Sequence, residues 1–78
     1  MKPVDIATIE IFKTNVNAPE AASAIIKRLK ITFPFYQFNF DLEDCDKILR
    51  VESETDSVNV EKIISLVKEE NIEIEILE

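Results

Sequence analysis

Residues 14–23 read TNVNAPEAAS, and within this stretch the sequence changes from the pattern of a strand to that of a helix. Residues 6–14 are rich in β-branched side chains and carry apolar residues on both faces, which is typical of a central strand. Asn17 and Glu20 stand three residues apart, the spacing of an N-cap and its capping-box partner. We therefore predict that a helix begins at about Ala18.

The predicted helix carries its apolar side chains along one stripe. Ala22, Ile25, Ile26 and Leu29 follow the spacing i, i+3, i+4, i+7, which puts them on one face that can pack on a sheet. We expect the helix to end near Lys30, because β-branched residues and a Phe-Pro step follow it.

An antiparallel hairpin is predicted after this helix. Residues 36–42 alternate between apolar and polar side chains, with aromatic residues on the inward face, and residues 48–52 resume the alternation. The acidic residues 43–46 between them predict a reversal of the chain.

A second amphipathic helix and a last strand complete the pattern. The apolar stripe recurs at Val60, Ile63, Ile64 and Val67. Three candidate capping residues stand before it, namely Asp56, Ser57 and Asn59. Residues 72–76 alternate as a strand, and Asn71 precedes them at a position where a left-handed residue is often needed.

The order β-α-β-β-α-β predicts an α+β fold, the ferredoxin-like sandwich. Right-handed crossovers place both helices on one face of a four-stranded antiparallel sheet. The 78 residues suffice for a single domain spanning residues 1–78. The other face must carry either Ile9 and Ile11 or Ile6 and Phe12, which leaves apolar area open to a partner.

Charge limits the partners of this chain. The 9 Lys and Arg against 16 Asp and Glu leave a net charge of −7, which disfavours nucleic acid and membrane as partners. We interpret the basic group Lys27, Arg28 and Lys30 as the complement of a helix dipole. With one cysteine, no long apolar run and no signal pattern at its start, the chain is expected to be cytoplasmic.

Catalytic chemistry is not indicated by the residues. The chain contains no histidine for proton transfer near neutral pH and no glycine for a phosphate-binding loop. Arg28 and Arg50 are not accompanied by an anion-cradling loop of the acylphosphatase type. We therefore expect no catalytic residues and no enzyme activity.

Two stretches, FKTNVN at residues 12–17 and FNFDLEDCDKILRVES at residues 38–53, resemble the heavy-metal-associated domain family. Members of that family bind copper(I), zinc or related soft ions through a Cys-x-x-Cys pair before the first helix. They serve as metal chaperones or as regulatory domains of metal-pumping ATPases. The pair would fall on Ala18 and Ala21, whose methyl groups donate no electrons to a metal. The resemblance therefore implies the family's fold without its metal site, and no bound cofactor is expected.

Glu20 and Cys45 are the remaining ligand candidates. Glu20 has the chemistry of a hard-metal ligand, but its place in the first helical turn favours a structural role. Cys45 is expected in an exposed turn far from the Ala18 loop, between Asp44 and Asp46, without the positive neighbours that activate a thiol. It is a weak candidate thiol. The acidic turn lacks the glycine and the register of an EF-hand, so we predict a solvated turn there.

Two hypotheses of function remain. In the first, the chain is a non-catalytic, heavy-metal-associated-like domain that acts as a protein-interaction or regulatory module, with another protein or a second copy as partner. Its contact would be the loop around Asn15, Asn17, Pro19 and Glu20, or the open face of the sheet. In the second, it handles copper or zinc as a chaperone does, through non-standard ligands such as Cys45 or a partner's cysteine.

Overall fold

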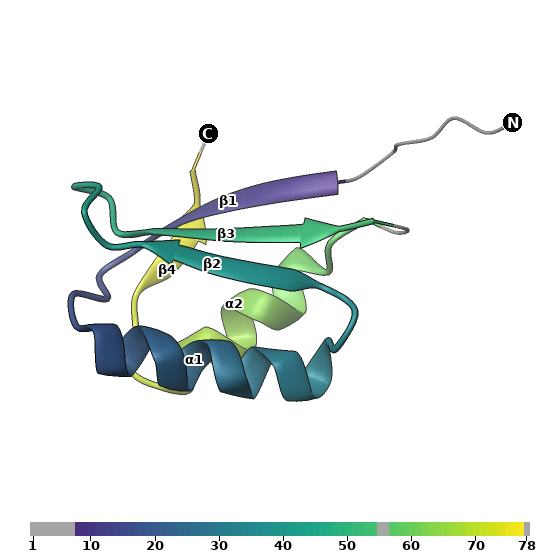
Figure 1. The fold of residues 1–78 in the computed structure, drawn as a ribbon, viewed down its shortest axis with the longest axis horizontal. Helices are drawn as coiled ribbons and strands as arrows, with labels where there is room; N and C mark the ends of the chain where they lie inside the picture. Colours follow the sequence, from purple (N-terminus) through teal and green to yellow (C-terminus); the bar gives the residue numbers. More distant parts are fainter. Residues whose placement is uncertain (1–7, 55–56, 78) are drawn as a thin grey trace, which may run out of the picture.

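The computed structural model describes residues 8–54 and 57–77. The elements are, in chain order, β1 (Thr8–Thr14), α1 (Pro19–Thr32), β2 (Gln37–Asp41), β3 (Ile48–Ser53), α2 (Val60–Lys68) and β4 (Ile74–Ile76). The strands form one sheet in the order β2-β3-β1-β4, and every neighbouring pair is antiparallel. Both helices lie on one face of it (Figure 1). The predicted ferredoxin-like βαββαβ sandwich is therefore confirmed.

The two halves of the sheet interlock. β3 lies between β1 and β2, and β1 lies between β3 and β4, so that each strand-helix-strand unit encloses one strand of the other. Phe12 is at the centre of this arrangement, opposite Leu49 of β3 and Ile76 of β4, and its side chain is fully buried. β1 therefore makes the contacts that hold the two units together.

Alternation along β1 decides which of its side chains face the helices. Phe12 and Thr14 are buried on the covered face, whereas Ile9 and Ile11 point to the open face, where Ile9 is 42% exposed. The prediction that one apolar pair of this strand would be left on the open face is confirmed. That pair is Ile9 and Ile11, and Ile6 lies outside the described residues.

The beginning of α1 differs from the predicted one. The helix starts at Pro19, and its N-cap is Ala18, which has an extended backbone and makes no side-chain hydrogen bond. The predicted capping box of Asn17 and Glu20 is therefore wrong. A residue before proline is held extended, so Ala18 and not Asn17 becomes the last residue outside the helix.

The same rule explains the end of α1. The helix continues past the predicted Lys30 to Thr32, and its C-cap is Phe33, the residue before Pro34. Proline disfavours the helical conformation mainly at the residue directly before it, so the β-branched Thr32 can still be helical. The Phe33 amide donates to the Leu29 carbonyl oxygen at 2.8 Å and closes the last turn.

The predicted ends of α2 are observed. Asn59 is the N-cap, and its Oδ1 accepts a hydrogen bond from the Lys62 amide at 3.2 Å. Of the other two candidates, Ser57 precedes the cap and Asp56 lies outside the described residues. Asn71 has a φ of 63°, the left-handed conformation predicted for it after the helix.

One hydrophobic core lies between the sheet and the two helices. Each helix buries its predicted stripe, through Ala22, Ile25 and Leu29 of α1 and Ile63 and Val67 of α2. The strands contribute five buried apolar side chains, Phe12, Phe38, Leu49, Val51 and Ile74. In the described part of the chain, neither helix has the length and apolar composition needed to cross a bilayer.

We expect Ile63→Val to lower the free energy of unfolding by about 1 kcal/mol, because it removes one methylene from a fully buried side chain. Ile31→Val is the matched control, since Ile31 is exposed, and should change this free energy by less than about 0.5 kcal/mol. Urea unfolding followed by circular dichroism measures both. Equal effects of the two substitutions would contradict the described packing.

Candidate functional site

The loop between β1 and α1 is anchored by Thr14, the last residue of β1. The Thr14 hydroxyl donates to the Lys47 carbonyl oxygen at 2.6 Å and accepts a hydrogen bond from the Val16 amide at 3.2 Å. The Thr14 amide donates to the Asp46 carbonyl oxygen at 3.1 Å. Because Thr14 is buried, these bonds are shielded from water. They fix the start of the loop to the turn between β2 and β3.

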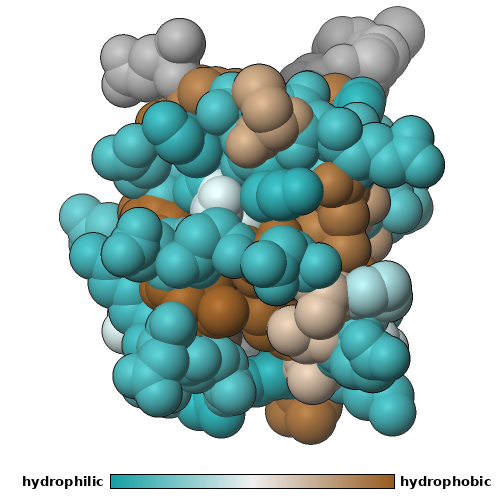
Figure 2. Space-filling model, turned by 90° about the vertical axis from the view of Figure 1, so that its left-hand side faces the viewer, coloured by the Kyte–Doolittle hydropathy of each residue, from teal (hydrophilic) through white to brown (hydrophobic). Residues whose placement is uncertain are grey.

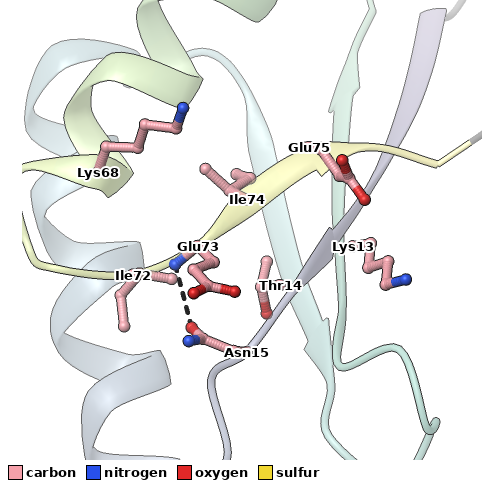
Figure 3. Close-up of a pocket in the computed structure, with 8 residues that line it drawn as sticks. All are labelled: Lys13, Thr14, Asn15, Lys68, Ile72, Glu73, Ile74 and Glu75. Atoms are coloured by element: carbon pink, nitrogen blue, oxygen red, sulfur yellow. Dashed lines mark hydrogen bonds between the residues drawn. The ribbon is translucent and has the colours of Figure 1, made fainter.

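A second anchor joins this loop to the connection between α2 and β4. The Glu73 amide donates to Asn15 Oδ1 at 3.1 Å, a contact drawn in Figure 3. Asn15 belongs to the predicted interaction loop, but its side-chain oxygen is engaged within the chain.

The other residues of the predicted interaction loop are open to solvent. Asn17, Pro19 and Glu20 are exposed, and the last two border a shallow hollow on α1. The family's ligand positions, Ala18 and Ala21, are partly buried at the start of α1. Figure 2 shows this end of the molecule, where apolar atoms lie in separate patches between hydrophilic side chains. The alanine methyl groups offer no donor atom to a metal.

The turn that contains Cys45 lies at the same end of the sheet as this loop (Figure 1). The expectation that the two would be far apart is not met, because Thr14 bonds directly to the turn. β1 and β2 run in the same direction, so the segments that follow them meet at one end of the sheet.

Cys45 is exposed, as predicted. Its sulfur and the carboxylate oxygens of Asp44 and Asp46 lie within 4.8 Å of one another. The Asp44 carboxylate already accepts a hydrogen bond from the Asp46 amide at 2.8 Å, which stabilises the turn itself. The arrangement is therefore explained by the turn, without an ion.

A hollow of about 560 Å³ opens beside β4. Residues 13–15, Lys68 and residues 72–75 line it, from the end of β1, the end of α2 and the β4 segment. Ile72 and Ile74 give it apolar walls, and in Figure 3 the Ile74 side chain lies between those of Lys68 and Glu73. We call it the β4 hollow.

Two large apolar side chains are almost fully exposed where α1 passes into β2. Ile31 is 83% exposed and Phe35 is 87% exposed. We call this pair the α1–β2 corner. It is absent from the predicted sites, although the sequence carries a signal for it. Ile31 stands two residues after Leu29 and so falls outside the apolar stripe of the helix, and Phe35 follows a proline outside any alternating strand.

Partly buried neighbours hold the corner in place. The rings of Phe33 and Tyr36 stack with their centroids 4.7 Å apart and their planes at 6°. The Tyr36 hydroxyl donates to the Ser57 carbonyl oxygen at 3.3 Å and accepts a hydrogen bond from the Asn59 amide at 3.0 Å. The backbone on both sides of Phe35 is thereby tied to the beginning of α2.

The basic residues of α1 divide between two roles. The Arg28 guanidinium donates to the carboxylates of Glu69 and Glu70 and so links α1 to the end of α2. Lys27 lies one helical turn before Ile31, on the same face, and Lys30 donates to the Tyr36 carbonyl oxygen at 3.4 Å. Lys27 and Lys30 therefore give the α1–β2 corner a positive surround.

Comparisons of the chain with protein-family models, with curated protein sequences and with solved structures find no match. The fold alone defines the class of this protein, which is a ferredoxin-like α+β domain. Membership of the heavy-metal-associated family stays a prediction from the resemblance.

We expect Thr14→Val to lower the free energy of unfolding by about 1–3 kcal/mol, because the Val16 amide and the Lys47 carbonyl lose their shared partner. The Val16 amide should also exchange with solvent faster, which NMR measures directly. Thr32→Val, at an exposed position, is the matched control. An unchanged exchange rate of Val16 would contradict the anchoring role of Thr14.

Proposed function

We propose that this chain is a non-catalytic protein-interaction or regulatory module, a heavy-metal-associated-like domain without the soft-metal site. The observation that carries the proposal is the α1–β2 corner, where Ile31 and Phe35 are almost fully exposed. Single exposed apolar side chains are ordinary on protein surfaces, but aromatic residues are enriched in interface cores, and the exposed Phe35 stands four residues after the exposed Ile31.

The corner is also preorganised for contact. The stacked pair Phe33 and Tyr36 and the hydrogen bonds of Tyr36 hold the backbone beside Phe35 before any partner arrives. A partner that buries Phe35 therefore pays little conformational entropy for ordering this segment.

The corner is preferred to the two predicted contact surfaces. In the loop, the Asn15 side chain is engaged with Glu73. On the open face, Ile9 is half as exposed as Phe35, and Ile11 is partly buried even without a covering layer. Neither surface offers as much uncovered apolar area per residue as the corner does.

The loss of the metal site can be tested by restoring it. We expect Ala18→Cys/Ala21→Cys to bind copper(I) at sub-micromolar concentration, because the N-cap and N3 side chains lie close together, as in a capping box, and a helix N-terminus favours thiolates. The native chain should show no binding at residues 15–22. Titration against a competing chelator, followed by backbone amide shifts, locates any site.

Ala18→Cys/Ala24→Cys is the matched control, because residue 24 lies about 9 Å along the helix axis from the N-cap, too far for both thiols to bind one ion. Failure of Ala18→Cys/Ala21→Cys to bind would count against the likeness to metal-binding domains.

The alternative function, soft-metal handling through Cys45 or a partner's cysteine, is favoured by the close approach of Asp44, Cys45 and Asp46. On this alternative, adding copper(I) or zinc(II) to the native chain should shift the backbone amide signals of residues 43–47. These shifts should disappear in Cys45→Ser.

The interaction role can be tested in cells that naturally make the protein. We expect a photo-crosslinking benzoylphenylalanine in place of Phe35 to give discrete adducts, because the side chain lies in the proposed contact. The same group in place of Lys62, which is exposed on α2, is the control and should give none of these adducts. Adducts should be resolved by mass, and identical patterns at both positions would refute the role of the corner.

A further inference from the structure

We propose that two copies of this chain associate through β2, which pairs antiparallel with β2 of the second copy about a two-fold axis at Asn39. The sheet would then run through both molecules. This inference does not rest on the α1–β2 corner, because it concerns a different surface, the free edge of β2. In the order β2-β3-β1-β4 this strand is the outermost one, with no strand of the described chain on its other side (Figure 1).

The register of the sheet fixes which backbone groups of β2 face outward. The Leu77 amide donates to the Ile11 carbonyl oxygen, so the backbone groups of odd-numbered residues in β1 face β4 and those of even-numbered residues face β3. Carried through the β1–β3 and β2–β3 pairs, this alternation turns the backbone groups of odd-numbered β2 residues towards β3. The N–H and C=O groups of Phe38 and Phe40 therefore point away from the sheet.

These four outward groups are free, whereas those next to them along the edge are engaged. No group within residues 8–54 and 57–77 bonds to the outward N–H and C=O of Phe38 and Phe40. At Tyr36, the preceding outward position, the amide donates to the Phe33 carbonyl oxygen at 3.2 Å and the carbonyl accepts from Lys30 Nζ at 3.4 Å. The free groups thus form a short, defined stretch that another strand can pair with.

One antiparallel register satisfies all four groups of both copies. With Asn39 opposite Asn39 of the second copy, each Phe38 faces a Phe40, and residues paired in this way exchange two N–H···O bonds. A register shifted by two residues would place one phenylalanine opposite Tyr36 or Leu42, whose carbonyl oxygens already accept from lysine ammonium groups. The hydrogen-bonding pattern therefore selects the two-fold axis at Asn39.

The side chains of β2 agree with this register. On the open face, Gln37 of each copy lies opposite Asp41 of the other, so an amide meets a carboxylate and no like charges are opposed. On the covered face, Phe38 and Phe40 form cross-strand aromatic pairs, which stabilise sheets. Phe40 is only partly buried in the single molecule and has apolar area left for this contact. The acidic turns at residues 43–46 lie at opposite ends of the paired strands.

The other edge of the sheet is protected against the same pairing. β4 has three residues, and Glu75 is at its centre. Two β4 strands paired in the same way would bring Glu75 opposite Glu75, which is destabilising. β2 has five residues with the neutral Asn39 at its centre, and its one charged residue is at its end. Shortness and charge are usual means by which proteins block edge pairing, and the central part of β2 has neither.

The association is a closed and weak one. Pairing of two identical edges about a two-fold axis leaves no second β2 edge free, so assembly stops at the dimer. An edge contact buries less than the roughly 800 Å² per partner of stable interfaces, which makes this a transient one. The net charge of −7 on each copy opposes the encounter, and salt screens that repulsion. Dimerisation is therefore measured at submillimolar to millimolar protein in about 0.15 M salt.

Two lysine substitutions on the same face of β2 test the register. Asn39→Lys puts like charges opposite each other at the two-fold axis and should weaken dimerisation severalfold. Gln37→Lys, the matched control, adds the same charge opposite Asp41 and should leave dimerisation unchanged or strengthen it. In sedimentation equilibrium, the mass of the native chain should rise with concentration from the 9.0 kDa monomer towards twice that value. Both positions are exposed, and unchanged far-UV circular dichroism will show that the variants fold.

The backbone hydrogen bonds are tested in full-length chains made by chemical synthesis and ligated at Cys45. N-methylation of the Phe40 amide removes an outward N–H without removing a bond of the sheet, so dimerisation should weaken at least tenfold. N-methylation of the Ile76 amide is the matched control, because this amide faces outward on β4, and it should leave dimerisation unchanged. Circular dichroism of both chains should match that of the native one.

Amide exchange with solvent locates the contact directly. At high concentration the Phe38 and Phe40 amides should exchange more slowly than at low concentration, because they become bonded only in the dimer. The Asn39 amide, which faces β3, should change less. A native chain that stays monomeric at millimolar concentration would overturn the proposal. Equal effects of Asn39→Lys and Gln37→Lys, or a mass that rises beyond the dimer, would overturn it too.

Discussion

The pairing of β1 with a neighbour on each side is the constraint on which the rest of the structure depends. Because β3 and β4 belong to the second strand-helix-strand unit, β1 is the strand through which the first unit holds the second. Phe12 must therefore be fully buried, and the strand must end at Thr14, whose hydrogen bonds fix both the following loop and the β2–β3 turn. The geometry of that whole end of the molecule follows from one central strand.

The sequence predicts the elements that follow from periodicity, and its errors concern the start of α1 and the place of one turn. The apolar stripes of both helices, the Asn59 cap and the left-handed Asn71 are local patterns, and they are observed. The capping role of Asn17 failed because Pro19 imposed an extended conformation on the residue between them, a stronger constraint than a side-chain hydrogen bond. The Cys45 turn was misplaced although the predicted crossover already makes β1 and β2 parallel, so that the segments after both strands meet at one end of the sheet.

The candidate sites were harder to predict than the fold, because they depend on which side chains the packing leaves exposed. In the sequence Ile31 falls outside the apolar stripe of its helix and Phe35 falls in a loop, and the structure shows how far both side chains are left uncovered. The loop that resembles a metal site holds its shape through Thr14 and Asn15, so it is ordered by the protein's own hydrogen bonds. A loop fixed in this way needs no ion to define its shape.

Lys47 adopts a φ of 47°, a conformation that glycine usually occupies, in a chain that has no glycine. For other residues this conformation costs about 1–2 kcal/mol. Two hydrogen bonds offset that cost: the Lys47 ammonium donates to the Leu42 carbonyl oxygen at 3.0 Å, and the Lys47 carbonyl accepts from the Thr14 hydroxyl at 2.6 Å. The second partner belongs to β1, so the turn reaches its full stability only after β1 has docked. The stability of the β2–β3 turn is therefore coupled to the presence of a strand from the other half of the chain.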